Sequence, residues 1–308
     1  FRTDYHNIIC SKSFRRLLNK THVFSVSTNP LISNRMTHSI ECYLLAEIIA
    51  KMLGLNHYLS STIGIGHDIG HAPFGHLGER MITKLSGQKF RHEIFGVILL
   101  EDIENFGLGL NLSREILKGI NNHSRGSDNL TIDQNLPLEF SVVVLADKIS
   151  YLFSDIEDCL KVGFLNKRNL PSYYFKLGEN KKQRIYNCLK AIQKESLECG
   201  MIKFQDTPEA ILFEKMKKWM YENVYFIIDE QLQRKEMEIA MEKAWGKITK
   251  FCEQKPELSP VFITAIMTDM EIFQLASNKK EINELNCFEN ISYCKKQPYQ
   301  KQLASIKR

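Results

Sequence analysis

The stretch from Gly66 to Glu79 is unusually dense in side chains that can do chemistry. It holds three of the nine histidines of the chain, two carboxylates and four glycines. The adjacent His67 and Asp68 can both bind a metal ion, and the glycines and Pro73 bend the backbone so that the later histidines turn back toward the same point. Because few of its side chains are suited to packing, we interpret this stretch as a functional site and not as a core element.

Two residues elsewhere could complete a metal site with His67 and Asp68. His38 lies at the start of the apolar face of a helix expected over 36–53, and Asp147 lies within a helix expected over 138–160. Two imidazoles and two carboxylates suit an octahedral divalent ion such as Mn²⁺, Fe²⁺ or Mg²⁺, with positions open for water or phosphate. Taken alone, a histidine on an apolar face is more often a core residue. Because the four residues lie on three different helices, the metal-site hypothesis requires these helices to converge.

The helix expected over 138–160 is apolar almost all round, apart from one polar line. That line consists of Asp147, Tyr151, Asp155 and Asp158, at positions i, i+4, i+8 and i+11. A polar stripe usually faces solvent. Because the rest of this helix is apolar, we interpret the line as facing inward, into a site.

The elements around these residues are expected to be mostly helical. The chain has 308 residues, with only 16 Gly and 8 Pro, and its composition is typical of a globular protein. Pro73 disfavours helix at Ala72, so His71 lies in a turn, and a helix that starts near Gly75 puts His76 and Glu79 on one face. Other helices are expected over 11–19, 180–199, 208–253 and 259–278, with a short strand over 173–177 and a weakly packed tail from Lys279.

Charge and cysteine content indicate which ligands the chain can bind and in which compartment it acts. The net charge of +5 suits anionic small molecules, and without a dense basic block it allows only weak binding of single-stranded DNA. The eight cysteines show no CxxC spacing, which indicates buried thiols in a reducing cytoplasm. The apolar runs are too short to cross a membrane. Since the chain begins with Phe1, we expect its N-terminus to be truncated.

Several longer strings are more specific than the order His…His-Asp…Asp. They are Phe14–Leu17 with Lys20–Phe24, Asn34–Ser39, His67–Glu79, Leu110–Ser113 with Gly119, Ile120, His123 and Ser124, and Leu145–Tyr151 with Asp155–Asp158. These strings resemble the FRRLxxKTQVF, xRLTHS, HDLGHxPFGHxGE, LNLTxExxxGIxxHS and LADxIAYxxxDIxD motifs of deoxyguanosinetriphosphate triphosphohydrolases, a family of HD-domain phosphohydrolases. The resemblance covers about residues 1–165, with a fainter match at 265–269.

The resemblance implies an all-α fold, with an HD-domain catalytic core over 1–165 and a C-terminal helical region over 166–308 packed on it. It also implies an activity: metal-dependent hydrolysis of a deoxynucleoside triphosphate (dNTP), with dGTP as the first expectation. The cut at the α-phosphorus releases deoxynucleoside and triphosphate. Members of the family tend to form homo-oligomers, often hexamers, whose interfaces can hold nucleotide effectors.

The family also implies roles for individual residues. The metal ligands would be His38, His67, Asp68 and Asp147, and the residues for acid/base work beside the metal would be His71, His76, Glu79 and His92. Substrate contacts would come from Arg35 on the phosphate, Tyr151 under the sugar and Asp155 on its 3′-hydroxyl. His123 is placed with these substrate-binding residues, although it could also simply cap a helix end. A ring packed under the sugar would exclude a 2′-hydroxyl by steric clash.

The chain departs from the family near its C-terminal motif. At the position where the family has an arginine expected to approach the nucleotide, the chain has Met270. Phe262, Ile263 and Ile266 also differ from the family pattern. Base preference and effector binding are therefore left open. Two alternative functions remain: another HD phosphohydrolase acting on a nucleoside 5′-monophosphate or a guanosine polyphosphate, and a nucleotide- or single-strand-binding regulator with weak catalysis. The presence of all four metal-binding residues argues against the second.

Overall fold

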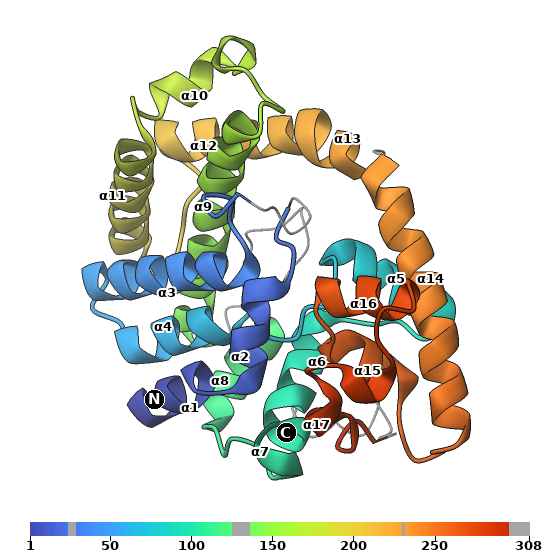
Figure 1. Cartoon of the computed structure of the whole chain (residues 1–308). Coiled ribbons are helices and arrows are strands. Elements are labelled where there is room, and N and C mark those ends of the chain that lie inside the picture. The colour runs from blue at the N-terminus through green and yellow to red at the C-terminus, as the bar shows by residue number, and fades with distance from the viewer. Residues whose placement is uncertain (24–28, 125–135, 230–231, 296–308) are drawn as a thin grey trace.

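The computed structural model describes residues 1–23, 29–124, 136–229 and 232–295, and it is all-α, as the sequence predicts (Figure 1). Within these ranges the only β-type pairings are two isolated bridges, Thr21 to Asn34 and Leu258 to Lys295. Among the same residues, none of the helices combines the length and the apolar character needed to cross a bilayer. Phe24, the last residue of the first motif, lies outside the described residues.

The centre of the fold consists of α3 (Arg35–Met52), α4 (His57–Gly66) and α9 (Leu138–Lys161), which pack on one another (Figure 1). The start of α3 is set by a capping box: the side-chain oxygen of Asn34 accepts the backbone N–H of Thr37, and the Thr37 hydroxyl oxygen accepts the backbone N–H of Asn34. Its end comes before Gly54, which takes a positive φ of 69°. The predicted helices over 36–53 and 138–160 are confirmed as α3 and α9 to within one residue.

Shorter helices make up the rest of the helical structure in the first 122 residues. In chain order they are α1 (Arg2–Ile9), α2 (Lys12–Arg16), η1 (Leu17–Asn19), α5 (His76–Ser86), α6 (His92–Ile98), the π-helical turn η2 (Leu99–Ile103), α7 (Glu104–Gly107) and α8 (Arg114–Asn122). The sequence analysis did not predict α1. Helix α8 packs against both α4 and α6, which brings the chain after residue 122 back to the end of α4.

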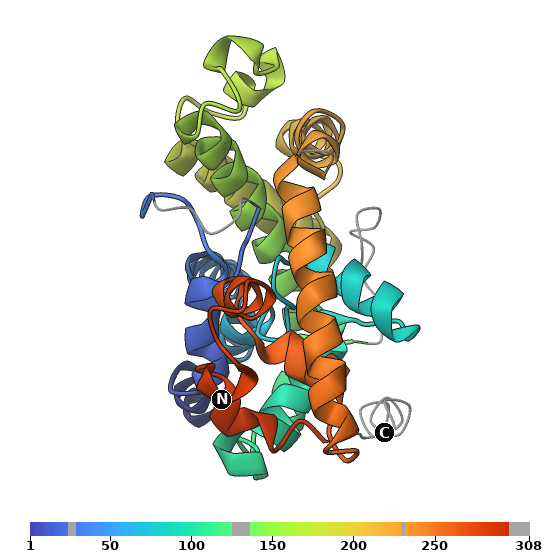
Figure 2. The ribbon, with the colours of Figure 1, turned by 45° about the vertical axis from the view of Figure 1, so that its right-hand side comes forward.

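The described residues after α9 form an arch that returns to the core (Figure 1). It comprises η3 (Lys167–Asn169), α10 (Ser172–Lys176), α11 (Lys181–Cys199), α12 (Pro208–Met220), η4 (Tyr221–Tyr225), α13 (Phe226–Asp229), α14 (Leu232–Glu253), α15 (Pro260–Ile266), α16 (Asp269–Ala276), η5 (Ile282–Glu284) and α17 (Phe288–Ile291). Figure 2 shows α14 running down the length of the molecule, and it packs against α5, α15 and α16. Through these contacts the C-terminal helices reach the His-rich stretch. The domain boundary at residue 165 stays a prediction.

Two local predictions are wrong. Residues 173–176 belong to the helix α10, and Leu177 is its C-cap, so the segment is not a strand. In the described residues no neighbouring strand exists to pair with it, whereas a helix satisfies its own backbone. The segment after Lys279 is not weakly packed as far as it is described, since Leu285, Cys287, Ile291 and Cys294 are buried. Its residues 296–308 lie outside the described part.

Candidate functional site

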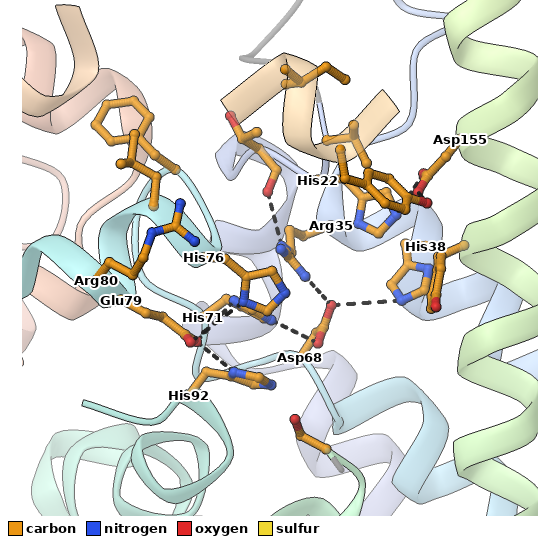
Figure 3. A pocket seen from close by; sticks show the side chains of 18 of the residues that line it. His22, Arg35, His38, Asp68, His71, His76, Glu79, Arg80, His92 and Asp155 are labelled. Atoms are coloured by element: carbon orange, nitrogen blue, oxygen red, sulfur yellow. Dashed lines mark hydrogen bonds and ion pairs between the residues drawn. The ribbon is translucent and has the colours of Figure 1, made fainter. Parts of the chain in front are cut away.

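A cavity of about 710 Å³ opens between α3, α9, the His-rich turn and the arch of η4 to α14. All of the predicted site residues except His67 line it, and they are Arg35, His38, Asp68, His71, His76, Glu79, His92, His123, Asp147, Tyr151 and Asp155. His67 is fully buried just beneath the cavity wall. Residues from five separate segments therefore meet at one place (Figure 3).

The four predicted metal ligands lie close together. The Nε2 atom of His38 is 3.0 Å from Oδ1 of Asp147 and 3.3 Å from Nε2 of His67. His67 Nε2 is in turn 3.3 Å from Oδ1 of Asp68. Adjacent ligands of an octahedral ion with bonds of about 2.1 Å lie about 3 Å apart. The donor atoms of His38, His67 and Asp147 lie within 4.8 Å of one another, a spacing that could hold a metal ion, and Asp68 lies beside them.

A hydrogen bond to the backbone orients the ring of His67. The Nδ1 atom of His67 lies 2.7 Å from the carbonyl oxygen of Gly64, to which it can only donate. The proton of the neutral ring is therefore on Nδ1, and the lone pair of Nε2 faces the other ligands, which is the tautomer that binds a metal. The end of α4 supplies both the ring and its acceptor, so this orientation is built locally.

The turn after α4 depends on two glycines. A side chain at Gly70 would lie 2.1 Å from the carbonyl oxygen of His92 and 2.3 Å from the nitrogen of Gly96, so only glycine lets α6 approach the turn. Gly75 has a φ of 58°, and a Cβ there would be 2.8 Å from Nη2 of Arg35. These close approaches bring His92 and Arg35 to the predicted metal ligands.

Arg35 is bound to Asp68 before any substrate arrives. Its Nη1 donates to Oδ2 of Asp68 at 2.6 Å, and its Nε donates to the carbonyl oxygen of Thr21 at 3.0 Å. The side chain is buried but still reaches the cavity. Arg35 therefore carries positive charge beside the metal ligands in a fixed position.

Glu79 is the centre of the proposed acid/base group. Its Oε1 is 2.5 Å from Nδ1 of His92 and 3.4 Å from Nδ1 of His71, while its Oε2 is 3.6 Å from Nδ1 of His76. The predicted pair of His76 and Glu79 is thus one arm of a larger cluster, and the shortest contact is to His92. His76 differs from the other two rings because its side chain is 68% exposed.

Burial and nearby charges decide the protonation of these groups. Burial disfavours the charged forms of Asp68 and Glu79, but the neighbouring histidines, and Arg35 in the case of Asp68, outweigh it and hold both pKa values well below normal. Burial and Arg35 lower the pKa of His71 well below its usual value. Burial opposes protonation of His92, yet Glu79 raises its pKa.

The same balance of burial and neighbouring charges sets the pKa values of the predicted metal ligands and of His123. Burial opposes charge on both Asp147 and His67, but Asp147 is held ionised by His38 and His67, and the pKa of His67 is raised well above normal by Asp68. Burial and the neighbouring His22 lower the pKa of His38. Burial, with His67 and His92 nearby, lowers the pKa of His123 to about 4.

Tyr151 and Asp155 on α9 line the cavity, whereas Asp158, the last residue of the predicted polar line, does not. Asp158 lies about 16 Å further along the helix axis than Asp147. There it accepts a 2.8 Å hydrogen bond from the backbone N–H of Ser33 and pairs with Lys161, away from the cavity. The polar line thus ends at Asp155.

Two residues of this wall were missed or left open by the sequence analysis. Tyr225 donates a 2.6 Å hydrogen bond from its hydroxyl to Oδ2 of Asp155, and His22 places Nε2 at 3.3 Å from Oδ1 of the same carboxylate. The His22 ring also stacks on His38, with ring centroids 4.3 Å apart. His22 sits in the first motif, where the family motif has glutamine, which was an available signal. Tyr225 lies in η4, outside any motif.

The C-terminal departures do not reach the cavity. Phe262, Ile263 and Ile266 are buried in the hydrophobic core, and Met270 is half exposed on the surface of α16. None of the four lines the cavity. The adjacent Asp269 instead accepts hydrogen bonds from the backbone N–H groups of Thr21 and Phe74, which ties α16 to two segments of the site.

Comparisons with known proteins show the family to which the chain belongs. Residues 35–152 match the family model of the HD domain. The chain is 37% identical over 230 residues to a deoxyguanosinetriphosphate triphosphohydrolase-like protein of Clostridium tetani, covering 73% of the chain and 66% of that protein. A protein of the same name from Clostridium perfringens (strain SM101) is 34% identical over 275 residues, covering 83% of the chain and 79% of the relative. Another such protein, from Caldanaerobacter subterraneus, is 38% identical over 224 residues, covering 70% of the chain and 64% of the relative.

Proposed function

Because the chain belongs to the family of deoxyguanosinetriphosphate triphosphohydrolase-like proteins, with an HD domain over residues 35–152, we propose that it hydrolyses dNTPs at the α-phosphorus. The family and the site make it a phosphohydrolase that binds a divalent metal. The substrate and the position of the cut are our proposal. One observation carries it: His38, Asp68 and Asp147 line the same cavity as Tyr151 and Asp155 of α9 and the His76–Glu79 pair.

We assign the metal to His38, His67, Asp68 and Asp147, whose donor atoms converge as described. When bound, a divalent ion supplies positive charge against phosphate oxygens and lowers the pKa of a water molecule that it binds. Arg35 adds a fixed positive charge at the same place, 2.6 Å from Asp68. Because charge builds on the phosphate oxygens as water attacks, this fixed charge favours the transition state.

We assign proton transfer to His76. Cutting at the α-phosphorus breaks the bond to the 5′-oxygen of the sugar, and that oxygen needs a proton as it leaves. The exposed ring of His76 faces the cavity, and Glu79 stands 3.6 Å behind its Nδ1. His71 and His92 hold Glu79 in place from the other side.

We assign the deoxyribose to the wall formed by Tyr151 and Asp155. Burial, together with Tyr221 and Asp147, raises the pKa of Tyr151 well above normal, so its hydroxyl stays protonated. Asp155 is held by Tyr225 and His22, and in this position its carboxylate could accept a hydrogen bond from a 3′-hydroxyl. The ring of Tyr151 would then leave no space for a ribose 2′-hydroxyl.

The direct test is product analysis with a panel of dNTPs, offered singly and in pairs with Mn²⁺ or Mg²⁺. We expect inorganic triphosphate and deoxynucleoside in equal amounts, with dGTP the first substrate to try. Orthophosphate or pyrophosphate as the only phosphorus product would refute the proposal and favour another HD phosphohydrolase. Inclusion of nucleoside 5′-monophosphates and guanosine polyphosphates in the panel tests that alternative directly.

We further propose that the protein acts as a cytoplasmic homo-oligomer. An exposed apolar stripe on the outer side of α3 supports this, because Ile40, Leu44 and Ile48 follow at i, i+4 and i+8 and are each more than 40% exposed. Light scattering of the wild type and of Leu44→Lys tests it. We expect the charged variant to dissociate, and a wild-type monomer would contradict the proposal. Binding of nucleotide effectors and weak binding of single-stranded DNA stay predictions.

A further inference from the structure

The two ends of the cavity differ in charge. At one end Tyr151 and Asp155 of α9 line it, and at the other end Arg80 of α5 lines it. Figure 3 shows Asp155 and Arg80 on opposite sides of Arg35 and Asp68. The cavity therefore runs from a carboxylate, past the predicted metal ligands, to a cation.

Arg80 continues the face of α5 that carries His76. The two residues lie one turn apart, at positions i and i+4, and both line the cavity. Arg80 is exposed, and partial burial of its guanidinium lowers its pKa, although Glu79 and Glu238 act against this. Since an arginine stays protonated in proteins, Arg80 holds a permanent positive charge at the opening of the cavity.

Arg234 brings a second positive charge to this end from a distant part of the chain. It lies in the first turn of α14 and lines the same cavity, as does Met237 one turn further on. Helix α14 packs against α5, and Glu238, one turn after Arg234, acts on the charge of Arg80. The two arginines thus border the same end of the cavity from two helices.

The backbone of α5 adds a weaker effect of the same sign. The helix begins at His76, no side chain caps its first N–H groups, and both His76 and Leu77 line the cavity. The start of a helix carries a partial positive charge that favours anions. Two side chains and one helix start therefore make this end suited to a polyanion.

The proposed reaction, on which this inference rests, leaves the two outer phosphates of the substrate to be placed. With the deoxyribose at Tyr151 and Asp155 and the α-phosphate beside Arg35, these phosphates extend away from the sugar. We propose that Arg80 and Arg234 bind the β- and γ-phosphates of the dNTP and then the released triphosphate. Guanidinium groups suit this role because they donate paired hydrogen bonds to phosphate oxygens.

A guanine base is the other group that an arginine pair could recognise, through its O6 and N7 atoms. The base is joined to the sugar, however, and the sugar lies at the opposite end of the cavity in the proposed function. The position of the two arginines therefore favours the phosphates. The two ligands also give different results in a binding experiment.

The experiment measures binding of inorganic triphosphate and of deoxyguanosine to the full chain by calorimetry, at one fixed Mg²⁺ concentration. We expect Arg80→Gln and Arg234→Gln each to weaken triphosphate binding about tenfold or more, and the double variant to weaken it further. Affinity for deoxyguanosine should stay constant. Arg80→Lys should recover part of the loss, because it restores the charge but not the paired donors. With dGTP as substrate, KM should rise by a similar factor while kcat changes much less.

The matched control is Lys84→Gln. Lys84 lies one turn after Arg80 on α5 and pairs with Glu242 of α14 at 3.2 Å, but it does not line the cavity. This variant also removes a cation and a link between α5 and α14, and it should bind triphosphate as tightly as the wild type. Circular dichroism checks that each variant is folded.

Three results would overturn the inference. They are a wild type that does not bind triphosphate, equal affinity for triphosphate in the wild type and the double variant, and a double variant that loses deoxyguanosine instead. A failure of the proposed function looks different. In that case the wild type binds triphosphate through Arg80 and Arg234 but releases it from none of the dNTPs.

Discussion

Asp269 is expected to hold the site together although it does not line the cavity. Its carboxylate accepts 2.8 Å hydrogen bonds from the backbone N–H of Thr21 and from that of Phe74, and a further one from the Thr21 hydroxyl. Thr21 in turn accepts the Nε–H of Arg35, and Phe74 begins the turn that contains Gly75. We therefore choose Asp269→Asn as the perturbation.

The size of the effect follows from these bonds. Asparagine keeps one acceptor oxygen, so one backbone N–H must face an amide NH₂ group, and a hydrogen bond to a charged group contributes about 1.5–3 kcal/mol. Burial raises the pKa of Asp269 despite its hydrogen bonds to Thr21 and Phe74, so removing the charge recovers part of this cost. We expect a net loss of about 1–2 kcal/mol in the free energy of unfolding. Since a displacement of about 1 Å can cost about 100-fold in rate, kcat/KM should fall by about 10- to 100-fold.

The assay pairs chemical denaturation with turnover, measured as released triphosphate at a temperature where both proteins are folded. Glu195→Gln is the matched control. Glu195 is also a buried carboxylate that accepts backbone N–H groups, those of Gln205, Asp206 and Thr207, but it lies at the junction of α11 and α12. The control should lose stability and keep its turnover. If Asp269→Asn keeps wild-type turnover, or if both variants lose it equally, the reasoning about Asp269 is refuted.

Other substitutions test individual assignments. Asp147→Ala removes the carboxylate that contacts His38 and His67, so calorimetry should show loss of Mn²⁺ binding at that site together with loss of turnover, and unchanged turnover would reject the metal assignment. His76→Ala should lower kcat by about 10²- to 10⁴-fold while the melting temperature stays constant, because the side chain is largely exposed. Tyr151→Ala should reduce the preference for dGTP over GTP by about tenfold or more, measured as the ratio of kcat/KM values. The raised pKa of His67 means that, without a metal, its ring carries a second proton, on Nε2, and a metal needs that nitrogen free. Affinity for Mn²⁺ should therefore rise with pH up to that pKa and then level off, with proton release visible as a buffer dependence of the binding heat; affinity that is flat from pH 6 to 9 would contradict this.

The sequence determined the features that depend on a few neighbouring residues. The helix expected over 36–53, with His38 at the start of its apolar face, matches α3, whose start is set by Asn34 and Thr37, three positions apart. Pro73 and the glycines around it indicated the turn after α4 in the same way. These predictions succeed because backbone sterics and capping act within one helical turn. The strand over 173–177 failed because strand pairing depends on a partner elsewhere in the chain.

Only the tertiary structure decided how distant residues share their contacts. The sequence paired Glu79 with His76, but packing of α6 against Gly70 gives its shortest contact to His92. Asp155 receives Tyr225 from η4, which no motif marked. The physical reason is that the positions of helix axes are set by the whole hydrophobic core. A distance between side chains on different helices is therefore a property of the packed molecule, whereas the residue types that do the chemistry are already present in the chain.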